Sequence, residues 1–268
     1  MVTGTTTKGR IYVKIRKRAA LGVAFLAALT FVAGCQGSKS TPGGGGADNP
    51  ITKSASEELA DAVRKLNESS YAFETKLGSM GEKSGVADPV NKAVKMNLEL
   101  SAQGVRINID MVALGTDYYV KMNGLPLPGV DSSKYMHLDG TKISSLANLG
   151  IENIVDPTNL EHLVEQFVTV EKSGDGTFKG TIDLTKAPAM NQDLSSFGDK
   201  AKAAPFEATV DAEGRLTSLK ATISTTDSMP EMEWTTTYSD FGSAPKIEKP
   251  ADSEITQAPP QLTAILGG

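Results

Sequence analysis

The chain contains a single cysteine, Cys35, and the residues around it limit what its thiol can do. An uncharged, largely apolar run at 19–32 precedes it, and a glycine-rich stretch follows it. One cysteine cannot form an intramolecular disulfide or supply the repeated thiolate ligands of a structural zinc site. Since His137 and His162 are the only histidines, we expect no metal site. A modification of the thiol itself is the chemistry that remains.

The residues before Cys35 have the parts of a secretory signal peptide. Residues 1–34 contain no acidic residue and six basic ones: Lys8, Arg10, Lys14, Arg16, Lys17 and Arg18. The apolar run that follows is shorter than the about 20 residues that a membrane-spanning helix needs. A basic segment, a short apolar segment and small residues before a break predict that residues 1–34 are a signal peptide.

The last four residues of this region resemble the bacterial lipobox. In Val32-Ala33-Gly34-Cys35 an aliphatic residue and two small residues precede the cysteine. The resemblance implies that Cys35 receives a diacylglyceryl group and that a peptidase cuts between Gly34 and Cys35. The protein would then be exported and anchored to the outer face of the cytoplasmic membrane. The alternatives are a transmembrane anchor or a buried, unmodified cysteine.

The stretch after the cysteine has the composition of a flexible tether. Residues 36–50 are rich in Gly and Ser and end at Asn49-Pro50. The chain therefore divides into a signal peptide (1–34), a lipidated cysteine with its tether (35–50) and one domain (51–268). Without the six basic residues of the signal peptide, the formal net charge of −5 becomes −11. A domain of that charge repels nucleic acid, so we expect no nucleic-acid partner.

The domain begins with a helix signal and continues with strand signals. Ser54 and Glu57 form an S-x-x-E capping box, which predicts a helix over 54–67. Apolar and polar residues then alternate over 94–100 and 105–111, with a turn at 103–104, which predicts a hairpin. The apolar side of this hairpin is the candidate lining of a ligand cavity: Val94, Met96, Leu98, Leu100, Val105, Ile107, Ile109 and Met111.

Further strands are expected along the rest of the domain. They fall at 71–77, 117–122, 134–138, 178–184, 205–210, 216–223 and 231–238. Short helices are expected at 156–167 and 192–201. Because strands joined by tight turns form antiparallel sheets, and large sheets twist, we expect the sheet to curl. The prediction is an α+β fold in which a strongly curved antiparallel sheet, a half-barrel, wraps a few helices around an apolar core or cavity.

Four segments resemble a known family. They are LGTDYYVKMNG (114–124), DPTNLEHLVEQF (156–167), PFEATVDAEGRLTSLKATI (205–223) and TTYSDFGSAPKIEKPADSEI (236–255). Together with the lipobox, they are similar to the actinobacterial lipid-carrier lipoproteins of the LppX/LprG type, whose fold is like that of the LolA and LolB carriers. The resemblance implies that 51–268 is a lipid-carrier domain with a hydrophobic cavity for the acyl chains of an envelope lipid or glycolipid. It implies no catalysis and no cofactor.

Motifs for catalysis are missing from the sequence. It contains no G-x-S-x-G, no P-loop, no G-x-G-x-x-G and no H-E-x-x-H. His137 falls in an expected strand and His162 in an expected helix, where lone histidines are commonly structural or surface residues. We therefore expect a membrane-anchored lipid-binding protein that is not an enzyme. The competing hypothesis is a structural or interaction lipoprotein with a filled core that contacts other envelope proteins.

Overall fold

The structure, a computed structural model, describes residues 53–78, 81–102, 104–124, 129–142, 162, 164–186, 199–223 and 231–260. All of them belong to one compact unit, Pro50–Gly268. The expected signal peptide, Cys35 and the tether lie outside the described residues, as do most of the expected helices at 156–167 and 192–201.

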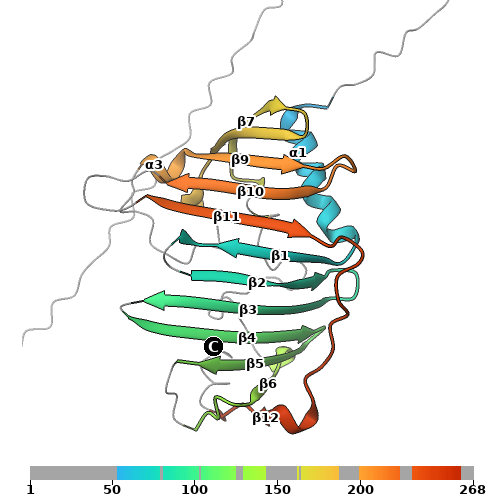
Figure 1. Cartoon of the computed structure of the whole chain (residues 1–268), viewed down its shortest axis with the longest axis vertical. Helices are drawn as coiled ribbons and strands as arrows, with labels where there is room; N and C mark the ends of the chain where they lie inside the picture. Colours follow the sequence, from blue (N-terminus) through green and yellow to red (C-terminus); the bar gives the residue numbers. More distant parts are fainter. Residues whose placement is uncertain are drawn as a thin grey trace, which may run out of the picture. The chain divides into compact units, whose positions relative to one another are not determined.

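Twelve strands form one sheet, in the order β12-β6-β5-β4-β3-β2-β1-β11-β10-β9-β8-β7 (Figure 1). Their bounds are β1 (Tyr71–Lys76), β2 (Gly81–Asp88), β3 (Ala93–Ala102), β4 (Val105–Leu114), β5 (Asp117–Asn123), β6 (Tyr135–Asp139), β7 (Phe167–Gly174), β8 (Thr177–Ile182), β9 (Ala204–Val210), β10 (Leu216–Ile223), β11 (Met232–Ser239) and β12 (Ile255–Gln257). Within the runs β1–β6 and β7–β11, each strand pairs with the next one in the sequence. Two pairs join distant parts of the chain, β1 with β11 and β6 with β12.

The half-barrel predicted from the sequence is wrong. The sheet is open, with β12 and β7 at its two edges, and it is mixed because β12 runs parallel to β6. In the described part of the chain, α1 (Ala55–Arg64) is the one α-helix longer than four residues, so a few helices wrapped by a sheet are not observed there. Each new strand pairs beside the previous one and extends the sheet. The edge strands β12 and β7 are therefore separated by the ten other strands of the sheet.

Most of the individual elements are confirmed. The predicted hairpin is formed by β3 and β4 around Gly104, whose φ of +81° lies in the region that favours glycine. The capping box starts α1: the Glu57 N–H donates to Ser54 Oγ at 3.2 Å, and the Ser54 N–H donates to Glu57 Oε2 at 2.8 Å. Strands β2, β7 and β12 were not predicted. Phe167, expected at the end of a helix, instead begins β7.

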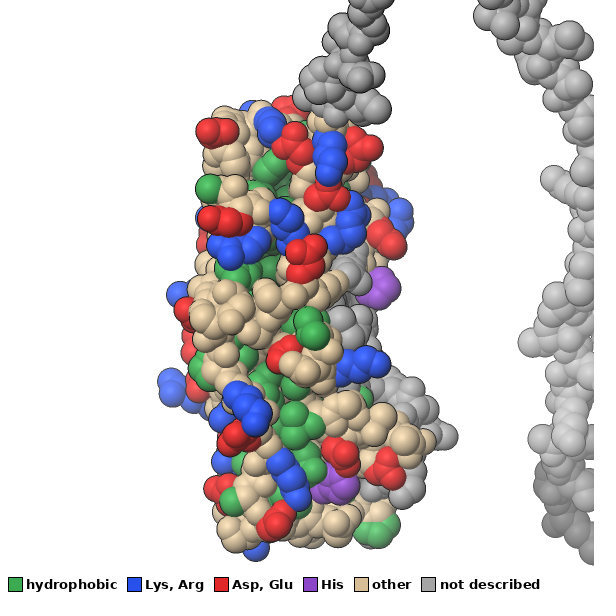
Figure 2. Space-filling model, turned by 90° about the vertical axis from the view of Figure 1, so that its right-hand side faces the viewer, with side chains coloured by type: hydrophobic (Ala, Val, Ile, Leu, Met, Phe, Trp, Pro, Cys, Tyr) green, Lys and Arg blue, Asp and Glu red, His purple; other side chains and the backbone are tan. Residues whose placement is uncertain are grey.

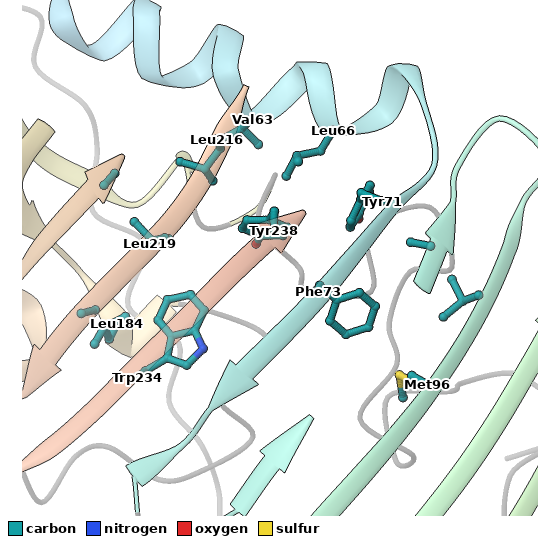
Figure 3. Close-up of a cluster of buried hydrophobic side chains, with 14 of the residues drawn as sticks. Val63, Leu66, Tyr71, Phe73, Met96, Leu184, Leu216, Leu219, Trp234 and Tyr238 are labelled. Carbon is teal, nitrogen blue, oxygen red and sulfur yellow. The ribbon is translucent and has the colours of Figure 1, made fainter. Parts of the chain in front are cut away.

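One face of the sheet carries the main core and is named here the inner face. Leu59 and Val63 of α1 pack onto it, as does Leu66 of the 3-10 turn Lys65–Glu68 that follows, and α1 lies against β7 and β10 (Figure 3). The inner-face residues of the central strands are Tyr71, Phe73 and Thr75 of β1, Lys83, Gly85 and Ala87 of β2, Val94, Met96 and Leu98 of β3, Ile109, Met111 and Ala113 of β4, and Trp234, Thr236 and Tyr238 of β11. Burial of each large apolar side chain contributes about 1.5–3 kcal/mol to folding.

A smaller cluster on the opposite, outer face holds the C-terminal segment. Residues 240–254, named here the strap, run from β11 along the strand ends to the far edge of the sheet, where β12 pairs with β6 (Figure 1). Ile247 of the strap is 8% exposed and packs with Ala93, Val112 and Tyr119. The strap therefore connects the middle of the sheet to its edge. Phe241 packs against the main core at its start, and Ile247 fastens its middle to the outer face.

Replacing Ile247 by Ala is expected to release the strap. The loss of a buried aliphatic side chain costs about 2–4 kcal/mol of the free energy of unfolding. The effect should be concentrated at β12, so its amides should exchange hydrogen faster, while those of β3 and β4 change little. Lys246→Ala is the control, because that side chain is 85% exposed. Equal exchange at β12 in the two variants would contradict this role of Ile247.

Candidate functional site

The eight predicted cavity residues lie on one side of the β3–β4 hairpin. The register pairs Met96 with Met111, Leu98 with Ile109 and Leu100 with Ile107. Three are buried (Val94, Met96, Met111), four are half-buried (Leu98, Leu100, Ile107, Ile109), and Val105 is 48% exposed. Their burial therefore increases from the β3–β4 turn toward the other end of the hairpin.

A row of side chains that includes three methionines crosses four strands of the inner face. Met96 of β3 pairs with Met111 of β4, Met111 with Val120 of β5, and Val120 with Met136 of β6. These four residues, named here the methionine row, are at most 3% exposed. Methionine side chains are flexible and can repack around irregular apolar shapes. The row is the part of the inner face best suited to an adaptable apolar contact.

A polar group interrupts the apolar inner face where β1, β2 and β11 meet. Thr75 and Thr236 are register partners, and their hydroxyl oxygens are 2.9 Å apart. Both are buried, at 3% and 0% exposure. Lys83, opposite Thr75 on β2, is half-buried, and Trp234 lies two residues from Thr236 on β11. These four residues are named here the donor cluster.

The sequence contains a signal for the donor cluster outside the predicted β3–β4 hairpin. Tyr71, Phe73 and Thr75 occupy every second position of β1, and Trp234, Thr236 and Tyr238 do the same in β11. A threonine therefore falls on the apolar side of each strand. Which strands would lie beside each other could not be derived from this alternation, so the pairing of the two threonines became visible only in the structure.

A charged groove of about 520 Å³ lies between α1 and the β7–β8 and β9–β10 turns. Its charges are paired: Asp61 contacts both Lys53 and Arg64, and Lys172 Nζ lies 2.6 Å from Glu58 Oε2. Basic and acidic side chains are interspersed over this end of the molecule (Figure 2). Of these pairs, Glu58–Lys172 fastens α1 to β7, whereas the two pairs of Asp61 lie within the helix and the residues before it. Since neither sign of charge dominates, the groove is not suited to attract a charged ligand.

The β9–β10 turn depends on one carboxylate, that of Asp211. It accepts hydrogen bonds from the backbone N–H and the guanidinium Nε of Arg215, both at 2.8 Å. Burial is the largest influence and raises the pKa of Asp211, but the hydrogen bonds and charge of Arg215 together outweigh it and lower the pKa. Arg215 also lies over the ring of Phe241, 4.5 Å from its centroid, so the turn positions the start of the strap.

Acid should therefore weaken this turn. Because the pKa of Asp211 is lower in the folded than in the unfolded chain, its stabilising contribution is complete above the unfolded value and is lost as the pH falls below about 4. We expect Asp211→Asn to lose less stability than the wild type between about pH 5 and about pH 3, measured by urea unfolding. Asp199→Asn is the control, because that carboxylate is 94% exposed. An unchanged slope for Asp211→Asn would contradict the assignment.

The two histidines occupy different surroundings. His137 Nε2 lies 2.7 Å from Asp117 Oδ1, and its ring stacks on Tyr119 of the outer-face cluster. His162 is exposed. Over the described residues, no group of three or more His, Cys, Asp and Glu side chains could hold a metal ion. No helix within those same ranges is long and apolar enough to span a membrane.

Comparisons with known proteins provide no family for this chain. No protein-family model matches it, and no curated protein matches it. Its residues and their arrangement are therefore the basis for assigning a function.

Proposed function

We propose that the protein is an exported lipoprotein, acylated at Cys35, that binds the acyl chains of an envelope lipid or glycolipid on the inner face of its sheet. It would transport or present that lipid across the cell envelope. The observation that carries the proposal is the methionine row on β3–β6. α1 packs against β7 and β10, on the other side of β1 from the row, so the row is a separate part of the inner face.

The energetics of chain burial support this role. Neighbouring strands are about 4.8 Å apart, so the row spans roughly 14 Å across the sheet. Each methylene group that an acyl chain buries there contributes about 0.8 kcal/mol to binding. A lipid anchor at Cys35 would hold the domain beside the membrane that contains such chains, which shortens the path for loading.

A second function also has an observation in its favour. Met96, Met111 and Met136 are at most 3% exposed, which is the burial expected of a filled core. A protein with a filled core would be a structural or interaction lipoprotein that contacts other envelope components. The two functions differ in whether the side chains of the methionine row repack to admit the acyl chain of a lipid.

Ligand binding by the purified chain distinguishes the two functions. A lipid carrier should retain lipid adducts in native mass spectrometry and should increase the fluorescence of an apolar dye. Met111→Leu/Met136→Leu keeps the volume but stiffens the row, so it should bind the dye several-fold more weakly at little cost in stability. Met232→Leu on β11 is the matched control. A wild-type chain without adducts and without dye fluorescence would contradict the carrier function and support the filled core.

The lipid anchor has its own test. Cys35→Ala removes the thiol that would accept the diacylglyceryl group, so the chain should keep its signal peptide or lose its membrane attachment. Intact mass and detergent phase partitioning of the expressed protein measure both properties. Ser38→Ala, three residues after Cys35, should be processed as the wild type is. If Cys35→Ala also behaves like the wild type, acylation at this residue is wrong.

A further inference from the structure

We infer that the donor cluster binds the anionic oxygen atoms of an amphiphile, such as the carboxylate or phosphate of a lipid headgroup, beside the methionine row. This inference rests on the proposed function and specifies the ligand class. It is carried by buried hydrogen-bond donors that share one face of three adjacent strands, β2, β1 and β11.

The first donor is a threonine hydroxyl. In the Thr75–Thr236 pair one hydroxyl donates to the other across 2.9 Å, and the accepting hydroxyl still has its own hydrogen to donate. Among the described residues, neither hydroxyl has a further hydrogen-bond partner. Both side chains are at most 3% exposed. One O–H is therefore buried without an acceptor in the part of the chain that the structure describes, which is rare because such a group loses its hydration without replacement.

The second donor is the indole of Trp234. This side chain is 6% exposed, and its Nε1–H can only donate. Within the described ranges it has no acceptor. Figure 3 shows the indole nitrogen on the side of the ring away from Leu184. Trp234 and Thr236 are two residues apart on the same strand and face, so their donors can converge on one ligand group.

The third contribution is the charge of Lys83, the register partner of Thr75. Lys83 is half-buried and also interacts within the chain, so its role here is to make this part of the face positive. The described inner-face residues of β1, β2, β3, β10 and β11 include no acidic side chain. A cluster of donors that includes a positive charge, with no carboxylate among these described strand residues, complements an anionic acceptor.

The donor cluster adjoins the methionine row. Leu98 pairs with Lys83 across β2 and β3, and Met96 is the next inner-face residue along β3. A headgroup held by the donors would therefore direct its chain over Leu98 onto the row. The two ends of an amphiphile would thus contact neighbouring parts of the buried inner face, the headgroup at the donor cluster and the acyl chain at the methionine row.

Three probes that share a sixteen-carbon hydrocarbon chain but differ in their headgroup test the inference: hexadecyl phosphate, hexadecanoate and hexadecanol. The purified wild-type chain should bind the two anionic probes about tenfold more tightly than the alcohol, the ratio expected for charge-assisted hydrogen bonds. Trp234→Phe and Thr75→Val/Thr236→Val should each remove most of this preference and leave hexadecanol binding unchanged. Lys83→Gln should reduce both the preference and its dependence on salt.

The valine double variant also separates a binding role from a structural one. It removes a buried donor that has no acceptor while keeping the side-chain shape, so the melting temperature without ligand should stay equal or rise. Thr235→Val/Thr237→Val, on the outer face of the same strand, is the matched control and should leave the preference unchanged. A lower melting temperature with an unchanged preference for anionic probes would overturn the inference.

The remaining outcomes separate this inference from the proposed function. If all variants bind the three probes as the wild type does, the donor cluster is not a headgroup site, although the proposed function stands. If the wild type binds none of the probes, both fail. Inorganic phosphate should not displace hexadecyl phosphate, because burial of the hexadecyl chain of this probe supplies much of its affinity. Displacement would assign the cluster to a free anion and overturn the headgroup assignment.

Discussion

The antiparallel pairing of β1 with β11 holds the two halves of this protein together. On either side of it lie the runs β1–β6 and β7–β11, in which each strand pairs with its neighbour in the sequence. Without this pair the runs would be two separate sheets. Two further connections cross the same junction: α1 precedes β1 but packs on β7 and β10, and the strap follows β11 but returns to β6. The buried Thr75–Thr236 hydrogen bond therefore lies at the junction between the two runs.

Local patterns in the sequence predicted local structure well. The capping box at Ser54 and the alternation on both sides of Gly104 are confirmed, because a cap and a hairpin depend on residues that are close in the chain. β2 was missed because Lys83 and Gly85 occupy its inner positions and break the alternation. Phe167 was misassigned because Val164 and Phe167 have helical spacing, while Val168 and Val170 fit a strand equally well.

The overall architecture could not be derived from the same patterns. Alternation identifies strands but not which strands lie beside each other or how strongly the assembled sheet curls, so it could not distinguish an open mixed sheet from a half-barrel. β12 has three residues in a polar segment, so the parallel pair that makes the sheet mixed had no sequence signal. The candidate site was affected in the same way. The hairpin face was predicted, but Val120 and Met136 joined the methionine row, and the two threonines met, through registers between strands that the sequence does not specify.

The strap has a consequence for the order in which the protein can fold. The run β1–β6 has two outer strands, β1 and β6, and each is covered by a strand from the C-terminal 232–257 region. Until that region has been synthesised, both strands present unpaired N–H and C=O groups, which are templates for association with other chains. One late segment thus protects both sides of the early run at once. Loss of residues 232–257 would leave both outer strands of the run, β1 and β6, with unpaired backbone groups. This region therefore protects the β1–β6 run from aggregation.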